Sequence, residues 1–265
     1  MSLRSPIFNT FSYFYGVNQN EMVKKLEDFE TFQQFFTREV KPREYNDNPA
    51  ELVSPADSRV LAIKKVEAND VYLIKGKTYG LCEYYEGKPD CQYDADTIDS
   101  LFKKNKENDL YSIILYLAPG DYHRFHSPTA INLTGGRHIP GVLKPVHKTS
   151  IKYFGKVYER NERVIVDGDW EHGKISLGFV GAVNVGSMTI NFDKELKTNR
   201  FDNKDGLFMP VNRDYKGISL AKGEEIGRFN FGSSVIALVE APKGFEFDLE
   251  TEQKVRYGDV IGRFK

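Results

Sequence analysis

Hydrophobic residues follow a helical spacing in the first fifty positions of the chain. Residues 6–15 are rich in Phe and Tyr, and apolar residues then stand at positions 22, 23, 26, 29, 32, 35 and 36. This spacing approximates the period of an α-helix, so we expect amphipathic helices in an N-terminal segment of residues 1–50. Their apolar faces either pack on the rest of the protein or rest on a lipid surface, where Lys24, Lys25 and Arg38 would assist. The pattern leaves both options open.

Beyond residue 50 the pattern changes to short β-branched and aromatic runs separated by Gly, Pro, Asn and Asp. The runs cover residues 59–66, 71–75, 111–117, 163–167, 174–192 and 233–240. Such runs between turn residues are typical of antiparallel strands. We therefore predict an α+β protein with a mainly antiparallel β catalytic domain over residues 51–265. One helix is expected over residues 96–106, and residues 199–215 are polar enough to predict a surface loop.

A short repeat supports the β architecture. The segment Gly223-Glu-Glu-Ile-Gly-Arg-Phe229 recurs as Gly258-Asp-Val-Ile-Gly-Arg-Phe264. Each copy predicts a turn followed by a strand. Paired turns of this kind resemble the barrel-sandwich folds of lipoyl and biotinyl carrier domains, although no carrier lysine motif accompanies them. The resemblance therefore predicts a barrel-sandwich type of domain and says nothing about a cofactor.

Composition narrows the function classes only slightly. A chain of 265 residues is expected to form one globular catalytic unit. The 37 Lys and Arg balance 38 Asp and Glu, so charge gives no reason to expect nucleic acid as a partner. Cys82 and Cys91 have neither zinc-site nor redox spacing, and we expect reduced thiols, with a disulfide as the less favoured alternative. No stretch is apolar enough to span a bilayer, and no secretory leader stands at Met1, so we do not expect an integral membrane protein.

Three residue types that together activate a nucleophile occur at separate positions. Asp57 precedes a predicted strand, His126 follows one, and Ser233 comes directly after Gly232. A serine hydroxyl becomes nucleophilic when a base accepts its proton, and a carboxylate holds that base in one tautomer. The order of the three along the chain is no obstacle. The residues fit a serine hydrolase, or a serine that attacks the carbonyl of Gly232 and cuts its own chain. A glycine inside a strand is also typical of a β-bulge.

The spacing of His123 and His126 raises the question of a metal. No Glu follows the first histidine as in zinc peptidases, and the sequence shows no third ligand. We therefore predict no metal site.

Six ordered motifs resemble the pyruvoyl-dependent phosphatidylserine decarboxylase proenzyme family over almost the whole chain. They are Phe35-Phe-Thr-Arg-Glu-Val-Lys-Pro42, Ser54-Pro-Ala-Asp57, the segment of residues 116–128, Asn161-Glu-Arg-Val164, Val180-Gly-Ala-Val-Asn-Val-Gly-Ser187 and the segment of residues 222–234. The segments of residues 168–170 and 239–242 look closer to mitochondrial-type members. Two positions depart from the family pattern: Ser234 replaces the usual Thr, which keeps a hydroxyl, and Ser58 replaces the usual Gly.

The resemblance implies an enzyme that converts phosphatidylserine to phosphatidylethanolamine and CO₂. Its cofactor would be a pyruvoyl group formed from Ser233 when the chain is cut after Gly232, which leaves fragments 1–232 and 233–265. His126 would be the base for this cleavage and Asp57 would orient it. His123 would meet the substrate carboxylate or assist proton transfer. If the source is eukaryotic, the family implies the mitochondrial inner membrane, with any leader or anchor outside this chain.

The implied partners are phosphatidylserine, a membrane surface that the N-terminal helices contact, and each self-cleavage fragment for the other. A homodimer is compatible with the sequence. Three alternatives stay open: a pyruvoyl enzyme that decarboxylates a soluble amino acid, the serine hydrolase, and a non-catalytic barrel-sandwich binding module. The N-terminal aromatic residues favour a lipid substrate.

Overall fold

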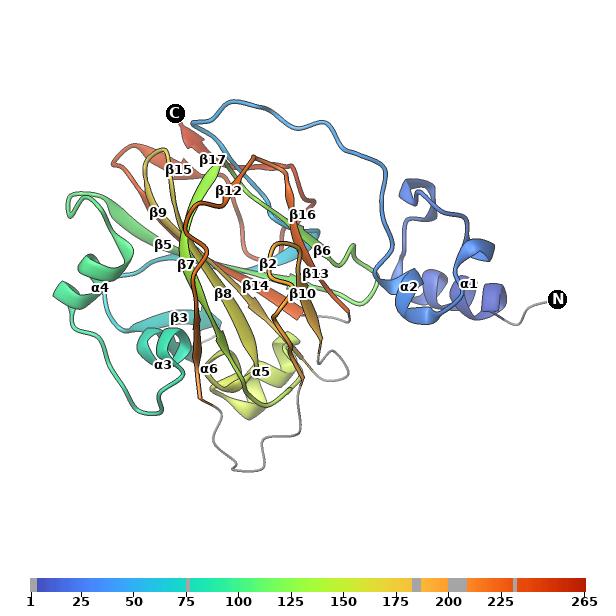
Figure 1. The fold of residues 1–265 in the computed structure, drawn as a ribbon, viewed down its shortest axis with the longest axis horizontal. Helices are drawn as coiled ribbons and strands as arrows, with labels where there is room; N and C mark the ends of the chain where they lie inside the picture. Colours follow the sequence, from blue (N-terminus) through green and yellow to red (C-terminus); the bar gives the residue numbers. More distant parts are fainter. Residues whose placement is uncertain (1–3, 75–76, 183–186, 200–208, 231–232) are drawn as a thin grey trace.

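The fold is α+β and mainly antiparallel, as predicted (Figure 1). The computed structural model describes residues 4–74, 77–182, 187–199, 209–230 and 233–265. Among these residues, every paired strand runs antiparallel to its neighbours. The strands of the largest sheet are, in spatial order, β11 (Val211–Arg213), β7 (Ile131–Ile139), β8 (Arg163–Trp170), β9 (Gly173–Val180), β14 (Ser233–Ala241), β5 (Asp109–Leu117), β2 (Ser58–Lys65) and β16 (Lys254–Val255). Strand β12 (Ser219–Leu220) also pairs with β7. This strand order is open, so the described sheet does not form a closed barrel.

Strand β14 lies in the middle of this sheet, and all of its residues are buried. Successive side chains of a strand point to opposite faces. Accordingly Val235 and Ala237 join one hydrophobic cluster, whereas Ile236 and Leu238 join the other. The continuous apolar run in the sequence therefore reflects a strand covered on both faces.

The repeated segments form turn-then-strand units, which confirms the prediction. The second copy ends in β17 (Val260–Phe264), between β1 (Leu52–Val53) and β15 (Phe245–Phe247); the first ends in β13 (Glu225–Phe229), between β10 (Met188–Ile190) and β6 (Arg124–His126). Gly223 and Gly258 have φ of +76° and +91°, which favours glycine. Tyr45 packs against both turns, and a Cβ on Gly223 would lie 2.3 Å from its ring.

A disulfide joins Cys82 and Cys91, so the expectation of reduced thiols is wrong. Helix α3 (Leu81–Glu86) carries Cys82 and ends at Gly87, whose φ is +70°. The chain reverses there and returns Cys91 to a Cα–Cα distance of 5.6 Å, within the usual disulfide range. Spacing alone did not reveal this reversal.

The remaining elements lie around the sheets. They are the hairpin of β3 (Asp70–Ile74) and β4 (Lys77–Gly80), and the helices α4 (Ala95–Phe102), α5 (Lys148–Phe154) and α6 (Val157–Arg160). Helix α4 confirms the helix expected over residues 96–106, although it ends earlier. In the predicted loop over residues 199–215, residues 200–208 lie outside the described residues and β11 forms a short strand.

The N-terminal segment is less helical than predicted and lies to one side of the sheets (Figure 1). Its elements are α1 (Arg4–Tyr15), two 3₁₀ turns, η1 (Gln19–Glu21) and η2 (Leu26–Asp28), and α2 (Phe32–Phe36). The apolar positions from 22 to 36 do not form one continuous helix, because Thr31 caps a new short helix by accepting a hydrogen bond from the Gln34 amide. No described helix is long and apolar enough to cross a bilayer.

The apolar stripe of α1 is divided between packing and exposure. Phe8 is buried and its ring stacks on Phe35 with a centroid distance of 4.9 Å. Tyr13 and Phe14, in contrast, are 84% and 74% exposed. The stripe therefore packs on α2 with one side and leaves aromatic rings in contact with solvent on the other.

Candidate active site

Three neighbouring strands bring the predicted site residues to one end of the large sheet. Asp57 directly precedes β2, and Ser233 is the first residue of β14. Between them lies β5, whose last residue, Leu117, pairs with Ser233. Because the strands are antiparallel, the starts of β2 and β14 lie beside the end of β5. The turn after β5 carries His123 and leads into β6, which ends at His126, so all four residues lie at this end of the sheet. Among the described residues, no hydrogen bond joins the Ser233 hydroxyl to either histidine.

Ser233 is completely buried, and its hydroxyl has no hydrogen-bond partner among the described residues. Leaving a buried hydroxyl unpaired costs about 1–3 kcal/mol, so such a group calls for an explanation. The next residue differs, because the Ser234 hydroxyl shares a 3.3 Å hydrogen bond with the hydroxyl of Tyr158. Gly232, on the other side of the predicted scissile bond, lies outside the described residues.

His126 has hydrogen bonds at both ring nitrogens. Nδ1 lies 2.8 Å from the Gly223 carbonyl oxygen, and Nε2 lies 3.1 Å from the Tyr122 hydroxyl. A carbonyl only accepts, so Nδ1 carries the proton and the Tyr122 hydroxyl donates to the lone pair on Nε2. The ring of Tyr257 stacks on the imidazole with a centroid distance of 4.2 Å. Burial lowers the pKa of His126, which favours the neutral form that a base requires.

Asp57 makes no direct hydrogen bond with His126 among the described contacts. Its carboxylate instead accepts from both terminal nitrogens of Arg43 and from the Tyr257 amide, at 2.9 Å. Asp57 therefore fixes the backbone of the residue whose ring stacks on His126. Arg43 also bonds Glu21, and this connects the carboxylate to the N-terminal segment.

His123 is completely buried and keeps one nitrogen free. Its Nδ1 donates to the Asp121 carbonyl at 2.8 Å, whereas Nε2 has no hydrogen-bond partner among the described residues. Burial lowers the pKa of His123 to about 3, so the ring is neutral. The His123 carbonyl accepts from the amide of Phe229, four residues before Ser233. The two buried, unpaired groups, His123 Nε2 and Ser233 Oγ, thus belong to directly connected segments.

The structure adds functional candidates that sequence reasoning missed. Tyr122 and Tyr257 contact His126, and Arg43 holds Asp57. Arg38, expected from the sequence at a lipid surface, is instead buried, and its Nη2 donates to the carbonyls of Gly120 and Asp121, in the turn that carries His123. Tyr122 and Arg38 lie inside family-like motifs, which could have signalled them. Nothing in the sequence spacing connects Arg43 or Tyr257 with the site.

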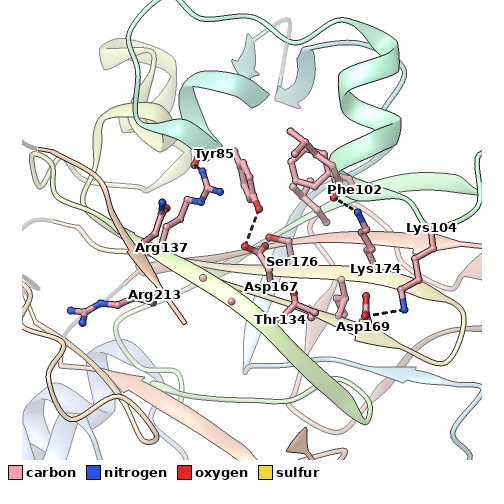
Figure 2. Close-up of a pocket in the computed structure, with 17 residues that line it drawn as sticks. Tyr85, Phe102, Lys104, Thr134, Arg137, Asp167, Asp169, Lys174, Ser176 and Arg213 are labelled. Carbon is pink, nitrogen blue, oxygen red and sulfur yellow. Dashed lines mark hydrogen bonds and ion pairs between the residues drawn. The ribbon is translucent and has the colours of Figure 1, made fainter. Parts of the chain in front are cut away.

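Two cavities differ in their relation to these residues. The larger, of about 490 Å³, lies between the sheet and helices α3 and α4, where Tyr85 bonds Asp167 at 2.9 Å (Figure 2). None of Asp57, His123, His126 and Ser233 lines it. A smaller cavity of about 320 Å³ includes Asp57 in its lining. Of the four residues only Asp57 lines it, so this cavity borders the candidate site but does not include Ser233 or either histidine. In the described part of the chain, no three His, Cys, Asp or Glu side chains converge as a metal site requires.

Comparison with known proteins identifies a matching family and several similar chains. The sequence model of a family described as phosphatidylserine decarboxylase matches residues 32–263. The chain is 37% identical to "Phosphatidylserine decarboxylase proenzyme, mitochondrial" of Rattus norvegicus and 36% identical to that of Pongo abelii; each alignment covers 98% of this chain and 67% of the relative. It is 31% identical to "Phosphatidylserine decarboxylase proenzyme 1, mitochondrial" of Arabidopsis thaliana, over 100% of this chain and 70% of the relative.

Proposed function

The chain belongs to the phosphatidylserine decarboxylase family, and we propose that it is a self-processing, pyruvoyl-dependent enzyme that converts phosphatidylserine to phosphatidylethanolamine and CO₂. One observation carries the proposal: Ser233, at the start of the central strand, is buried, its hydroxyl has no hydrogen-bond partner among the described residues, and the chain before it is hydrogen-bonded to the segment that contains His123 and His126. The relatives' names describe proenzymes, which supports maturation by cleavage.

Maturation begins when His126 accepts the proton of the Ser233 hydroxyl and Oγ attacks the carbonyl carbon of Gly232. The peptide C–N bond breaks as an ester forms on Oγ, and the nitrogen of residue 233 takes the proton from His126. Elimination then removes the Cα proton of residue 233 and cleaves the Cβ–Oγ bond, which releases the carboxylate of residue 232 and leaves dehydroalanine at position 233. Addition of water and loss of ammonia convert this residue to a pyruvoyl group. The fragments are residues 1–232 and 233–265.

The observed contacts define what the neighbouring side chains do in this step. The Gly223 carbonyl keeps the proton of His126 on Nδ1, so Nε2 is the basic atom. The Tyr122 hydroxyl donates to Nε2, and this hydrogen bond must break before Nε2 can accept the serine proton. Asp57 acts as a positioning residue, because it holds Tyr257 against the imidazole and its charge favours the protonated ring.

A pyruvoyl group at position 233 fits the residues present. The position is buried, which shields a ketone from water, and the unpaired Nε2 of His123 belongs to a segment tied directly to the chain before it. Such a group supplies an electron sink for decarboxylation of an amine-bearing substrate. His123, neutral and oriented by the Asp121 carbonyl, would meet the substrate or move a proton at Nε2.

The exposed rings of α1 support a membrane lipid as substrate over a soluble amino acid. Tyr13 and Phe14 lie on the N-terminal segment of residues 1–50, and the domain of residues 51–265 carries the chemistry. Aromatic side chains on one face of a helix favour the membrane interface. The relatives' names place them in mitochondria, and we propose the mitochondrial inner membrane for a eukaryotic source of this chain.

Denaturing mass spectrometry of the purified protein tests the proposal. We expect fragments 1–232 and 233–265, with the second lacking an amine at its first residue, and CO₂ release from phosphatidylserine that hydroxylamine abolishes. Ser233→Ala should remain full-length. Ser234→Ala is the matched control and should be cut, because Tyr158 already engages its hydroxyl. An intact chain that hydrolyses esters and releases no CO₂ from phosphatidylserine would instead indicate a serine hydrolase.

A further inference from the structure

Arg38 is a buried arginine whose hydrogen bonds are incomplete. It is 4% exposed, and Nη2 makes both of its described hydrogen bonds, to backbone carbonyls. Its Nε and Nη1 have no partner among the described residues. Arg163 shows that this protein can satisfy such a group, because all three of its nitrogens donate to carbonyls. Unpaired donors on a buried charge are costly, and a bound anion would satisfy them.

The cavity of about 320 Å³ that borders the candidate site is lined by Arg38 and by two more cations, Lys254 and Arg256. Its acidic residues are already engaged. Arg43 bonds the carboxylates of both Glu21 and Asp57.

The third acidic residue of the lining, Asp121, is also engaged. Its carboxylate accepts from the Ala118 amide at 2.7 Å, and burial raises its pKa to about 6. At pH 7 this carboxylate is largely ionised. Counting Arg43, which pairs with Glu21 and Asp57, four cations face three carboxylates, so the surroundings of the cavity carry one excess positive charge and favour an anion.

The location of this cavity links the exposed helix with the catalytic residues. Gly16, in its lining, directly follows the exposed end of α1. On the other side, Arg38 Nη2 and His123 Nδ1 both donate to the Asp121 carbonyl, so the guanidinium and the imidazole are close neighbours. An anionic group held here would lie between the membrane-facing helix and His123.

We propose that this cavity binds the phosphodiester of the lipid headgroup and that Arg38 is its buried ligand, with Lys254 and Arg256 adding positive charge. The inference rests on the proposed function and specifies how the substrate is recognised. Phosphate suits the role better than the substrate carboxylate. An arginine paired with the carboxylate would stabilise a charge that is lost as CO₂ forms, which slows the reaction, whereas the phosphodiester keeps its charge throughout.

The test uses mature enzyme, after electrophoresis has confirmed cleavage and the wild type has released CO₂ from phosphatidylserine. Failure at that stage would contradict the proposed function. Binding is then measured as inhibition by glycerophosphoethanolamine, which has the phosphodiester, and by free serine, which has the carboxylate. Arg38→Gln should raise KM for phosphatidylserine and weaken inhibition by glycerophosphoethanolamine about tenfold, with kcat little changed. Arg38→Lys should recover part of the loss.

A loss of serine inhibition alone in Arg38→Gln would assign the carboxylate instead, and unchanged inhibition by both compounds would also overturn the proposal. Arg38 holds the turn of His123, so its variants could fail to mature. In that case two exposed arginines, Arg256 and Arg263, provide a matched pair of variants that tests the anion site. Arg256 and Arg263 are 59% and 52% exposed, and each pairs with one carboxylate, at 3.4 and 3.5 Å, but only Arg256 lines the cavity. Arg256→Gln should weaken inhibition by glycerophosphoethanolamine severalfold and Arg263→Gln should not; equal values would refute the site.

Discussion

Single side chains in this site are controlled mainly through backbone groups. The Gly223 carbonyl sets the tautomer of His126 and the Asp121 carbonyl sets that of His123. The Asp57 carboxylate makes no described hydrogen bond with His126 and positions its ring through the backbone of Tyr257. Residue types and order along the chain could predict Asp57, His126 and Ser233 as partners. They could not predict these contacts, because carbonyl directions depend on turns that only the folded chain defines.

The hydrogen bond from Tyr122 to His126 Nε2 leads to a pH prediction. A donor on the lone pair stabilises the neutral imidazole, so it lowers the pKa in the same direction as burial. Tyr122→Phe should therefore raise the pKa of His126, and the base should become protonated at a higher pH than in the unsubstituted protein. Titration of ¹⁵N-labelled histidine in uncleaved Ser233→Ala protein measures this.

Tyr257→Phe is the matched control for that titration, because it removes a hydroxyl but keeps the ring that stacks on His126. We expect it to shift the His126 titration less than Tyr122→Phe does. Equal shifts in the two variants, or a lower pKa in Tyr122→Phe, would contradict the assigned direction of the Tyr122 hydrogen bond.

Strands were more predictable than helices in this chain. The run over residues 233–240 became β14 because its side chains are buried on both faces, and the repeat predicted β13 and β17 because its glycines adopt positive φ. The N-terminal pattern was misleading. Its apolar residues pack around Phe35 from several short elements, so a helical spacing in sequence does not correspond to one helix face.

Helix α1 should bind membranes through the rings that it does not pack. Tyr13→Ser combined with Phe14→Ser should weaken binding to phosphatidylserine-containing vesicles at least about tenfold, since burying one such ring contributes roughly 1.5–3 kcal/mol. Vesicle co-sedimentation measures this. Tyr153→Ser with Phe154→Ser removes a comparable exposed pair from α5 and is the control. Substitution is preferable to deletion of α1, because Phe8 supports Phe35 from inside the segment.

If both double variants bind vesicles as tightly as the wild type, α1 is not the docking surface. If the α5 pair alone weakens binding, the membrane contacts a different face of the molecule. Either result would remove the main support for a lipid substrate over a soluble amino acid while leaving self-cleavage untouched.

In the whole molecule, the chain after the predicted cut before Ser233 forms strands in the same sheets as the chain before it. The fragment of residues 233–265 contains β14, which pairs with β5 and β9, as well as β16 on β2 and β17 on β1. Residues far apart in sequence thus share one hydrophobic core on each face of the sheet. Cleavage removes one covalent connection and leaves these ladders in place.

We therefore expect both fragments to elute together in gel filtration of the mature protein under native conditions, and to separate only in denaturant. Removal of β14 would break its hydrogen bonds with both β5 and β9 and expose a strand that is buried along its whole length. Its removal is therefore far more costly than removal of an edge strand, which pairs on one side only. A reducing agent should have no effect, because Cys82 and Cys91 both belong to the fragment of residues 1–232. Elution of the smaller fragment alone from native, fully cleaved protein would show that the sheet does not hold the two chains together.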